Sequence, residues 1–279
     1  MSTTRRDFLK TTLTASTATA ALAAGIKTSA ADKSLSPPRD FYELRCYRLK
    51  PVASTALLDQ YLEHAFLPAL QARGLTRIGV FTEVEVNPKA GTFAAKPDSP
   101  VWVLITHPTL ASFVTISADL NADPAVQAAG AGYLQAVKTS PAYARIDSWL
   151  LRSFAGMPQL ELPPFSVNKT PTRIFEMRDY ESHSEARALS KMAMFNDGEI
   201  PLMKDLGMWP VFFGQALAGP NLPHLRYITS GPDLATHLAS WSKFGPDPRW
   251  LKMKDRPEYA DNVSKNTARF LVPTAYSQI

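Results

Sequence analysis

Cysteine is nearly absent from this chain of 279 residues, which contains only Cys46. A single cysteine excludes an intramolecular disulfide, even in an oxidising compartment. Cys46 shares one face of an alternating segment with Tyr42 and Leu44. We therefore expect a buried, unreactive thiol.

Metal-binding and catalytic motifs are also lacking. The five histidines, at positions 64, 107, 183, 224 and 237, show no zinc-ligand spacing and belong to no Cys/His cluster. The chain contains no P-loop, no G-x-S-x-G motif and no G-x-G-x-x-G motif. We accordingly predict no metal site, and no catalytic residue can be assigned from the sequence.

No apolar run reaches the roughly 20 residues that a membrane-spanning helix needs, so we predict no stable membrane span. The longest run, residues 11–26, follows a basic start that contains Arg5, Arg6 and Lys10. Small residues near Ser29 and Ala31 then offer a cleavage site. This layout predicts a signal peptide over residues 1–31, and the paired arginines resemble the bacterial twin-arginine signal. We expect export to the periplasm, with the twin-arginine translocase as a transient partner.

Excess charge is small once this segment is removed. The chain has 30 basic and 25 acidic residues, of which residues 1–31 hold four and one. The remainder is nearly balanced, and a nucleic-acid partner would need a clustered basic face. We therefore predict no nucleic-acid binding.

A phrase that occurs twice predicts the architecture. Residues 42–47, YELRCY, recur as FEMRDY at 175–180, and the same offset of 133 relates Pro68 to Pro201 and Gly74 to Gly207. An internal repeat indicates two copies of one structural unit.

Periodicity predicts the order of elements in each unit. For the first unit, residues 39–154, we expect strands at 41–49, 75–86, 101–106 and 145–154, a hairpin loop at 87–100, and helices at 54–73 and within 109–138. For the second unit, residues 172–279, we expect strands at 173–180, 208–218, 224–230 and 267–276, with helices at 184–206 and 233–244. Each unit is thus a ferredoxin-like βαββαβ arrangement. The Pro-rich segment 155–171 is predicted to be a linker.

The aromatic signatures resemble the NIPSNAP family. They are the repeated opening phrase, the segment WPVFFG at 209–214, and WSKF at 241–244 followed by DPRW at 247–250. In the first unit Thr76-Arg77 replaces the Trp-Pro pair, so the resemblance is clearest in the second. The resemblance implies an α+β fold in which two tandem ferredoxin-like units pack sheet to sheet as an intramolecular dimeric α/β barrel, and a monomer or homodimer.

The candidate ligand-binding residues lie on the repeated strands. We expect Tyr42, Leu44, Phe175 and Met177 to face the helices. The opposite set should then face the shared interior; it comprises Glu43, Arg45, Tyr47, Glu176, Arg178 and Tyr180. These residues either hold an anionic ligand, with a tyrosine as donor, or form ion pairs with neighbouring strands that set register without chemistry.

Three further candidates are Phe213, His224 and Tyr227. The aromatic side chains of the second unit either fill its core or form the wall of an apolar pocket. His224 either reaches the cleft or lies in a surface turn.

Two functions remain open. The first is a non-catalytic module that binds a small molecule or a protein, in line with the missing catalytic motifs and with the NIPSNAP resemblance. The second is an oxidoreductase or monooxygenase with a small site between the sheets. We predict no cofactor; the alternatives are flavin and haem, the latter with His64 as a candidate ligand.

Overall fold

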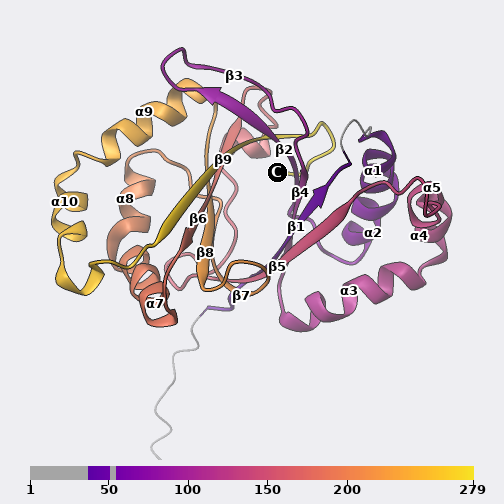
Figure 1. Ribbon diagram of the computed structural model, residues 1–279, viewed down its shortest axis with the longest axis horizontal. Helices are drawn as coiled ribbons and strands as arrows, with labels where there is room; N and C mark the ends of the chain where they lie inside the picture. The colour runs from indigo at the N-terminus through magenta and orange to yellow at the C-terminus, as the bar shows by residue number, and fades with distance from the viewer. Residues whose placement is uncertain (1–36, 51–54) are drawn as a thin grey trace, which may run out of the picture. The chain divides into compact units, whose positions relative to one another are not determined.

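The computed structural model describes residues 37–50 and 55–279 (Figure 1). The predicted signal peptide, residues 1–31, lies outside the described residues. Residues 37–279 form one compact unit.

Each half contains a split βαβ arrangement together with several short helices. The first half comprises β1 (Phe41–Arg48), α1 (Ala56–Tyr61), the π-helical turn η1 (Leu62–Phe66), α2 (Leu67–Ala72), β2 (Ile78–Asn87), β3 (Thr92–Ala95), β4 (Val101–His107), α3 (Leu110–Ala122), α4 (Pro124–Ala129), α5 (Ala131–Leu134) and β5 (Arg145–Ser153). The second comprises α6 (Pro164–Val167), β6 (Ile174–Glu181), α7 (Glu185–Met194), the π-helical turn η2 (Phe195–Glu199), α8 (Ile200–Asp205), β7 (Phe212–Ala218), β8 (His224–Gly231), α9 (Leu234–Phe244), α10 (Pro248–Lys254), the 3₁₀ turn η3 (Pro257–Tyr259) and β9 (Lys265–Pro273).

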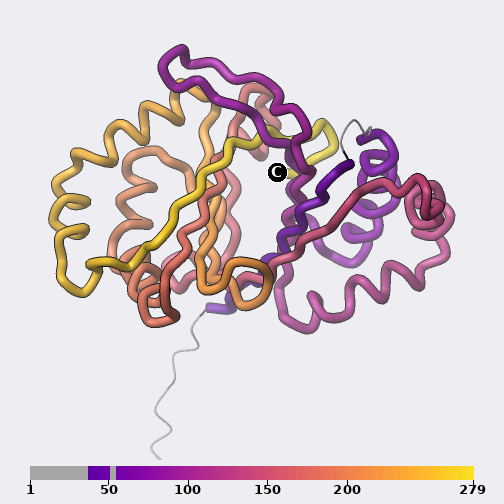
Figure 2. The backbone as a smooth tube through the Cα atoms, in the orientation of Figure 1, coloured from indigo at the N-terminus to yellow at the C-terminus, as the bar shows by residue number. Residues whose placement is uncertain are grey.

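The sheet closes on itself as a barrel. Its order is β3-β2-β4-β1-β5-β7-β8-β6-β9, and β9 pairs again with β2. Within each half the four main strands follow the ferredoxin-like order, so two antiparallel sheets join at their edges through β5–β7 and β2–β9. The predicted fold class is confirmed. Within residues 37–279 the helices lie outside the strands, α1–α5 over one half and α7–α10 over the other (Figures 1 and 2).

The expected assignment of the two sheet faces is wrong. Tyr42, Leu44 and Cys46 point into the barrel and share one buried cluster with Phe175 and Met177. Contacts across the halves show this directly, because the rings of Tyr42 and Phe212 lie 4.6 Å apart and those of Phe81 and Phe175 lie 5.1 Å apart.

The residues expected inside therefore lie beneath the helices. Alternation establishes that the two faces differ, but it does not say which face turns inward. On β1 and β6 the more apolar set faces the barrel interior. Buried charges need partners, and the charged set finds them under the helices, within its own strand and on a nearby histidine.

Two segments expected to be irregular are structured. Within residues 87–100, β3 pairs with β2 from Val84↔Ala95 to Asn87↔Thr92, although all four β3 residues are exposed. Such a strand depends on backbone hydrogen bonds and carries no apolar alternation to reveal it. The expected linker at 155–171 is also packed, because Met157 and Leu160 are buried and Leu160 joins the interior cluster. The predicted domain boundaries themselves stay predictions.

Candidate functional site

The charged residues of β1 form a buried group under the first helices. The Arg45 Nε donates to Glu43 Oε1 at 2.5 Å, and the Glu43 Oε2 lies 3.3 Å from His107 Nε2. The Arg45 guanidinium lies 5.1 Å from the ring centre of Phe66 and donates to Ser117 Oγ.

An equivalent group lies on β6 in the second half. Arg178 Nε donates to Glu176 Oε1 at 2.7 Å, and His237 Nε2 lies 2.7 Å from Glu176 Oε2. The guanidinium of Arg178 stacks on Trp241 at 3.8 Å. Ion pairs, one of the two alternatives, are thus present. Each pair lies within one strand and not between neighbouring strands, and a histidine also contacts each glutamate. The assignment of these residues to a ligand stays a prediction.

Both glutamates are held ionised. Burial alone would raise the pKa of Glu43 and of Glu176, but the histidine hydrogen bond and the neighbouring arginine outweigh burial and lower each pKa below its ordinary value. A carboxylate with a lowered pKa is a poor general base near neutral pH. This geometry favours a structural role for both groups.

The two histidines reach their glutamates from different positions. The helix caps Thr109 and Asp233 align the two halves, so His107, the last residue of β4, corresponds to Gly231 in β8. A Cβ at Gly231 would lie 2.7 Å from the His237 Cβ. The His237 side chain, on α9, therefore lies where the His107 side chain, on β4, lies in the first half. Sequence reasoning missed both histidines because the repeat does not align them.

The aromatic candidates fill the helix layer. Tyr180 and Tyr227 stack with ring centres 5.7 Å apart and hydroxyl oxygens 3.2 Å apart, and Phe213 lies 5.1 Å from Tyr227. Burial and the neighbouring Tyr180 raise the pKa of Tyr227 well above its ordinary value. Tyr47 is buried in the corresponding layer of the first half. Phe213, Tyr227 and Phe244 belong to the core of the second half, whereas Phe212 lies in the barrel interior and Trp209 is exposed.

His224 is not in a surface turn. Its side chain is buried, and its Nδ1 hydrogen-bonds to the carbonyl oxygen of Asn221 at 3.0 Å. A carbonyl can only accept, so Nδ1 carries the proton; burial lowers the pKa of His224 and keeps the ring neutral. Of the two alternatives, the structure excludes the surface turn, because His224 is the first residue of β8 and pairs with Glu181 of β6.

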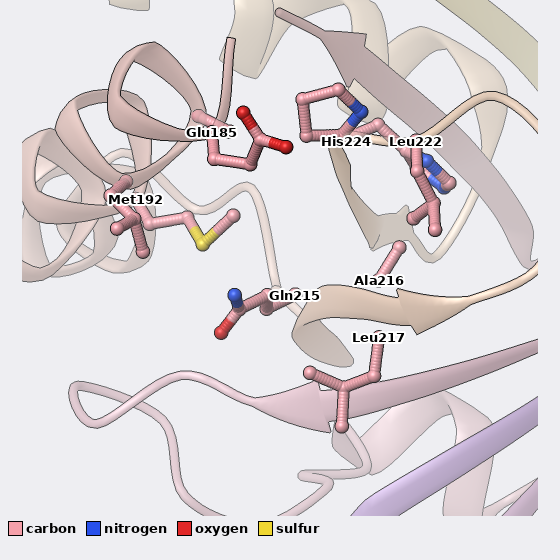
Figure 3. A pocket seen from close by; sticks show the side chains of 10 residues that line it. Glu185, Met192, Gln215, Ala216, Leu217, Leu222 and His224 are labelled. Carbon is pink, nitrogen blue, oxygen red and sulfur yellow. The ribbon is translucent and has the colours of Figure 1, made fainter.

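A pocket of about 320 Å³ opens beside His224, between α7 and β7. Figure 3 shows Glu185 and Gln215 directing their polar ends into the space that Met192 and Leu217 also border. The walls are mainly apolar, and Leu189, Leu217 and Leu222 are exposed.

A larger cleft, of about 500 Å³, lies at one end of the barrel interior. We call it the barrel-mouth cleft. The interior cluster fills the barrel beneath it, while both halves contribute charged side chains at the open end. The charged lining comprises Arg48, Glu83, Lys96, Asp98, Asp147, Arg226 and Arg269, and the lining also includes Cys46, Trp102 and Trp149.

Buried ion pairs link these strands. Arg226 on β8 donates from Nε and Nη2 to the Asp179 carboxylate, and Arg269 Nη1 donates to Asp179 Oδ2 at 2.7 Å. Glu83 accepts from Lys96 Nζ and from Trp102 Nε1. The Arg226 guanidinium lies 4.2 Å from the ring centre of Trp149.

Two residues at the cleft, Asp179 and Cys46, have shifted pKa values, and neither shift favours proton transfer near neutral pH. Burial would raise the pKa of Asp179, but Arg226 and Arg269 lower it below its ordinary value. Burial raises the pKa of Cys46 to about 12, so the thiol stays protonated. The expectation of a buried thiol is confirmed, and its lack of reactivity stays a prediction.

Sequence reasoning missed this cleft entirely, because its charges come from strands far apart in the chain. One signal was present. The offset of 133 aligns Asp179 with Cys46 in the sequence. The repeated phrase of the second unit therefore has a charged residue on a strand face that is otherwise apolar.

The described residues offer little to a metal or haem. No group of three or more potential metal ligands occurs among residues 37–50 and 55–279. His64, the candidate haem ligand, is 65% exposed at its side chain and lies beside Glu63. An axial ligand needs an enclosed pocket, so His64 does not fit that role. In the described part of the chain, no helix is both long and apolar enough to span a bilayer.

Comparison with known proteins supports the fold and the resemblance. Residues 175–278 match the NIPSNAP family model, which confirms the resemblance for the second half. No curated protein matches the chain in sequence.

Two solved structures share the fold over most of this chain, and a third matches a smaller part. A monooxygenase candidate from Lactobacillus acidophilus has a TM-score of 0.50 at 7% identity, covering 84% of this chain and 94% of that chain. One from Fusobacterium nucleatum has a TM-score of 0.50 at 8% identity, covering 85% and 93%. A NIPSNAP-like domain protein from Burkholderia xenovorans, 16% identical, covers 38% of this chain and 90% of its own, with a TM-score of 0.35. At these identities the likeness concerns the fold alone.

Proposed function

We propose that this chain, whose second half matches the NIPSNAP family, is an exported protein that binds a small molecule in the barrel-mouth cleft without transforming it. One observation carries the proposal: the barrel interior is packed at one end and open at the other, where a cleft of about 500 Å³ is lined by charged and aromatic side chains. Concave sites of this size with convergent polar groups are typical of ligand binding.

The chemistry of the lining favours recognition over catalysis. Catalytic acids and bases need pKa values near the working pH, whereas the pKa of Asp179 is lowered and that of Cys46 is raised to about 12. The arginines are held by carboxylates, and the tryptophans offer flat apolar surface. These features hold and orient a ligand.

A fragment screen by thermal shift tests the binding. Fragments that enter the cleft should raise the melting temperature of the mature protein, and a Lys96→Trp variant, which narrows the mouth, should lose that effect. Lys89→Trp, on the exposed turn of the same hairpin, is the matched control and should respond like the wild type. Fragments that stabilise both variants equally would place binding elsewhere.

An absorption spectrum of the purified mature protein tests the alternative. A colourless protein agrees with a binding module. A haem or flavin band that co-purifies with the protein would favour the oxidoreductase or monooxygenase instead.

Export rests on the signal-like composition of residues 1–31. Replacing Arg5 and Arg6 together by lysine should leave the precursor uncleaved inside the cell, and mass spectrometry of the wild type should find a chain that begins near residue 32. Equal export of the double variant would contradict the twin-arginine route. The oligomeric state, monomer or homodimer, stays a prediction.

A further inference from the structure

We propose that the ligand of the barrel-mouth cleft is a small organic carboxylate, whose anionic group accepts a hydrogen bond from Nη1 of Arg226. This inference rests on the proposed function and specifies its ligand. It starts from an unmet hydrogen-bond donor at a position where nearly every other polar group is paired.

Arg226 is the deepest charge in the cleft, and its side chain is 2% exposed. Its Nε and Nη2 donate to Asp179, but Nη1 is buried and has no partner in the described structure. The stacking on Trp149 and the two bonds to Asp179 fix the plane of the guanidinium. Nη1 is therefore a positioned donor, and an unmet buried donor is unfavourable.

The two carboxylates of the ion-pair network are already engaged. Asp179 accepts three N–H groups from Arg226 and Arg269, and Glu83 accepts hydrogen bonds from Lys96 and Trp102. A molecule that enters the cleft can supply the acceptor that Nη1 lacks.

The charge of this network calls for an anion. Arg269 Nε also lies 3.9 Å from Glu83 Oε1, so the ion pairs run from Arg226 through Asp179, Arg269 and Glu83 to Lys96. The network contains three cations and two carboxylates, and at its buried end Arg226 and Arg269 share the single carboxylate of Asp179. Among the other charged residues of the lining, Arg48 and Asp147 neutralise each other, and Asp98 is an exposed carboxylate that balances the remaining positive charge of the cleft.

Two guanidinium groups that share one buried carboxylate favour a singly charged group at this point over a phosphate dianion, whose second charge the balanced lining would not neutralise. Arginine binds carboxylates through charge-assisted hydrogen bonds. Trp102, Trp149, Pro100 and Pro220 supply apolar surface in the same cleft, which an organic body can cover and an inorganic ion cannot. A carboxylate with a small flat body fits both features.

Calorimetric titration of the mature protein with carboxylate–amide pairs tests the inference. The pairs are acetate with acetamide, benzoate with benzamide, and indole-3-acetate with indole-3-acetamide; each amide keeps the shape and removes the charge. At least one carboxylate should bind about ten-fold more tightly than its amide, as expected for a charge-assisted bond.

Variants then locate the anionic group. Arg226→Gln should remove the preference, and Arg226→Lys, which keeps the charge but lacks Nη1, should reduce it several-fold. Arg249→Gln is the control, because Arg249 is an exposed arginine paired with Asp205 and Asp247. If circular dichroism shows that Arg226→Gln does not fold, the comparison of carboxylates with amides on the wild type and on Arg226→Lys still tests the inference.

The outcomes separate the two proposals. If amides bind in the cleft as tightly as carboxylates, or if Arg226→Lys leaves the preference unchanged, the carboxylate assignment is overturned and the binding function stands. If no fragment of any charge binds, both the carboxylate assignment and the proposed binding function are wrong.

Discussion

At the scale of single residues, charge in this protein is placed where it is paired. Glu43 and Glu176 each contact an arginine two residues away and a buried histidine. Removing one partner of a buried pair leaves an uncompensated charge, which costs far more than the pair contributes net. These groups therefore matter for stability.

Glu176→Gln should reveal this through pH. The folded-state pKa of Glu176 is lowered, so its stabilisation is present above the unfolded value of about 4.3 and is lost as pH falls through the folded value. At pH 7 the variant should be less stable by about 3 kcal/mol, and the difference should shrink in acid. Urea denaturation at pH 7 and at pH 3.5 measures both.

The matched control for Glu176→Gln is Glu258→Gln. The Glu258 side chain is 59% exposed and its nitrogen partner on Arg256 is 3.9 Å away, so its loss should change stability by less than about 1 kcal/mol. An equal deficit of Glu176→Gln at both pH values would contradict the linkage argument.

At the scale of elements, the two halves share a detail that local sequence explains. Each first helix departs from regular α-helical geometry directly before the helix with Pro68 or Pro201 near its start. In the first half the departure is the π-helical turn η1, and in the second it is a kink within η2, where the backbone of Gly198 is not helical. Proline lacks a backbone N–H and its ring clashes with the carbonyl four residues earlier, so a regular α-helix is disfavoured there. Gly74 and Gly207 follow the ends of these helices with positive φ.

The connecting segment behaves as part of the core. Leu160 is 4% exposed within the interior cluster, and its backbone N–H donates to Asp40 Oδ2 at 2.9 Å. Leu160→Ala should therefore lower the free energy of unfolding by about 2–5 kcal/mol, measured by urea denaturation.

Val167→Ala is the control for Leu160→Ala in the same segment. Val167 is 64% exposed, so this change should cost no more than about 0.5 kcal/mol. If both variants kept wild-type stability, residues 155–171 would be the simple linker that composition suggests.

At the scale of the whole molecule, closure of the barrel depends on contacts between residues about 200 positions apart. The last residues of the chain lie along β2: Thr274 donates to the Val80 carbonyl at 2.9 Å, and Gln278 donates to the Ile78 carbonyl at 3.0 Å. The Ile279 side chain is fully buried in the interior cluster.

Deletion of residues 274–279 should therefore weaken the seam between β9 and β2. The loss of these hydrogen bonds and of the Ile279 side chain should lower stability by on the order of 5 kcal/mol, seen as a lower urea midpoint. Ile279→Ala should show part of this effect, and Leu251→Ala, on exposed surface of α10, should show almost none. A truncated protein with an unchanged midpoint would contradict closure by the C-terminal residues.

The sequence by itself determined the order of the four main strands in each half and of the longer helices between them, because alternation, helical spacing, proline and glycine act over a few residues. It did not reveal the exposed strand β3. The two repeated phrases also indicated two similar units, and the structure places their first strands, β1 and β6, at the same position in each sheet. On that basis Glu43, Arg45, Glu176 and Arg178 were candidates either for a ligand site or for ion pairs with neighbouring strands, and the pairs in the structure lie within one strand.

Only the tertiary structure decided which face of β1 and β6 turned inward, since alternation is the same for both choices. Only it brought Asp179, Arg226, Arg269 and Glu83 together, because they lie on four strands of a sheet that closes between distant parts of the chain. Local patterns record what one residue needs, whereas a cleft depends on which distant residues meet.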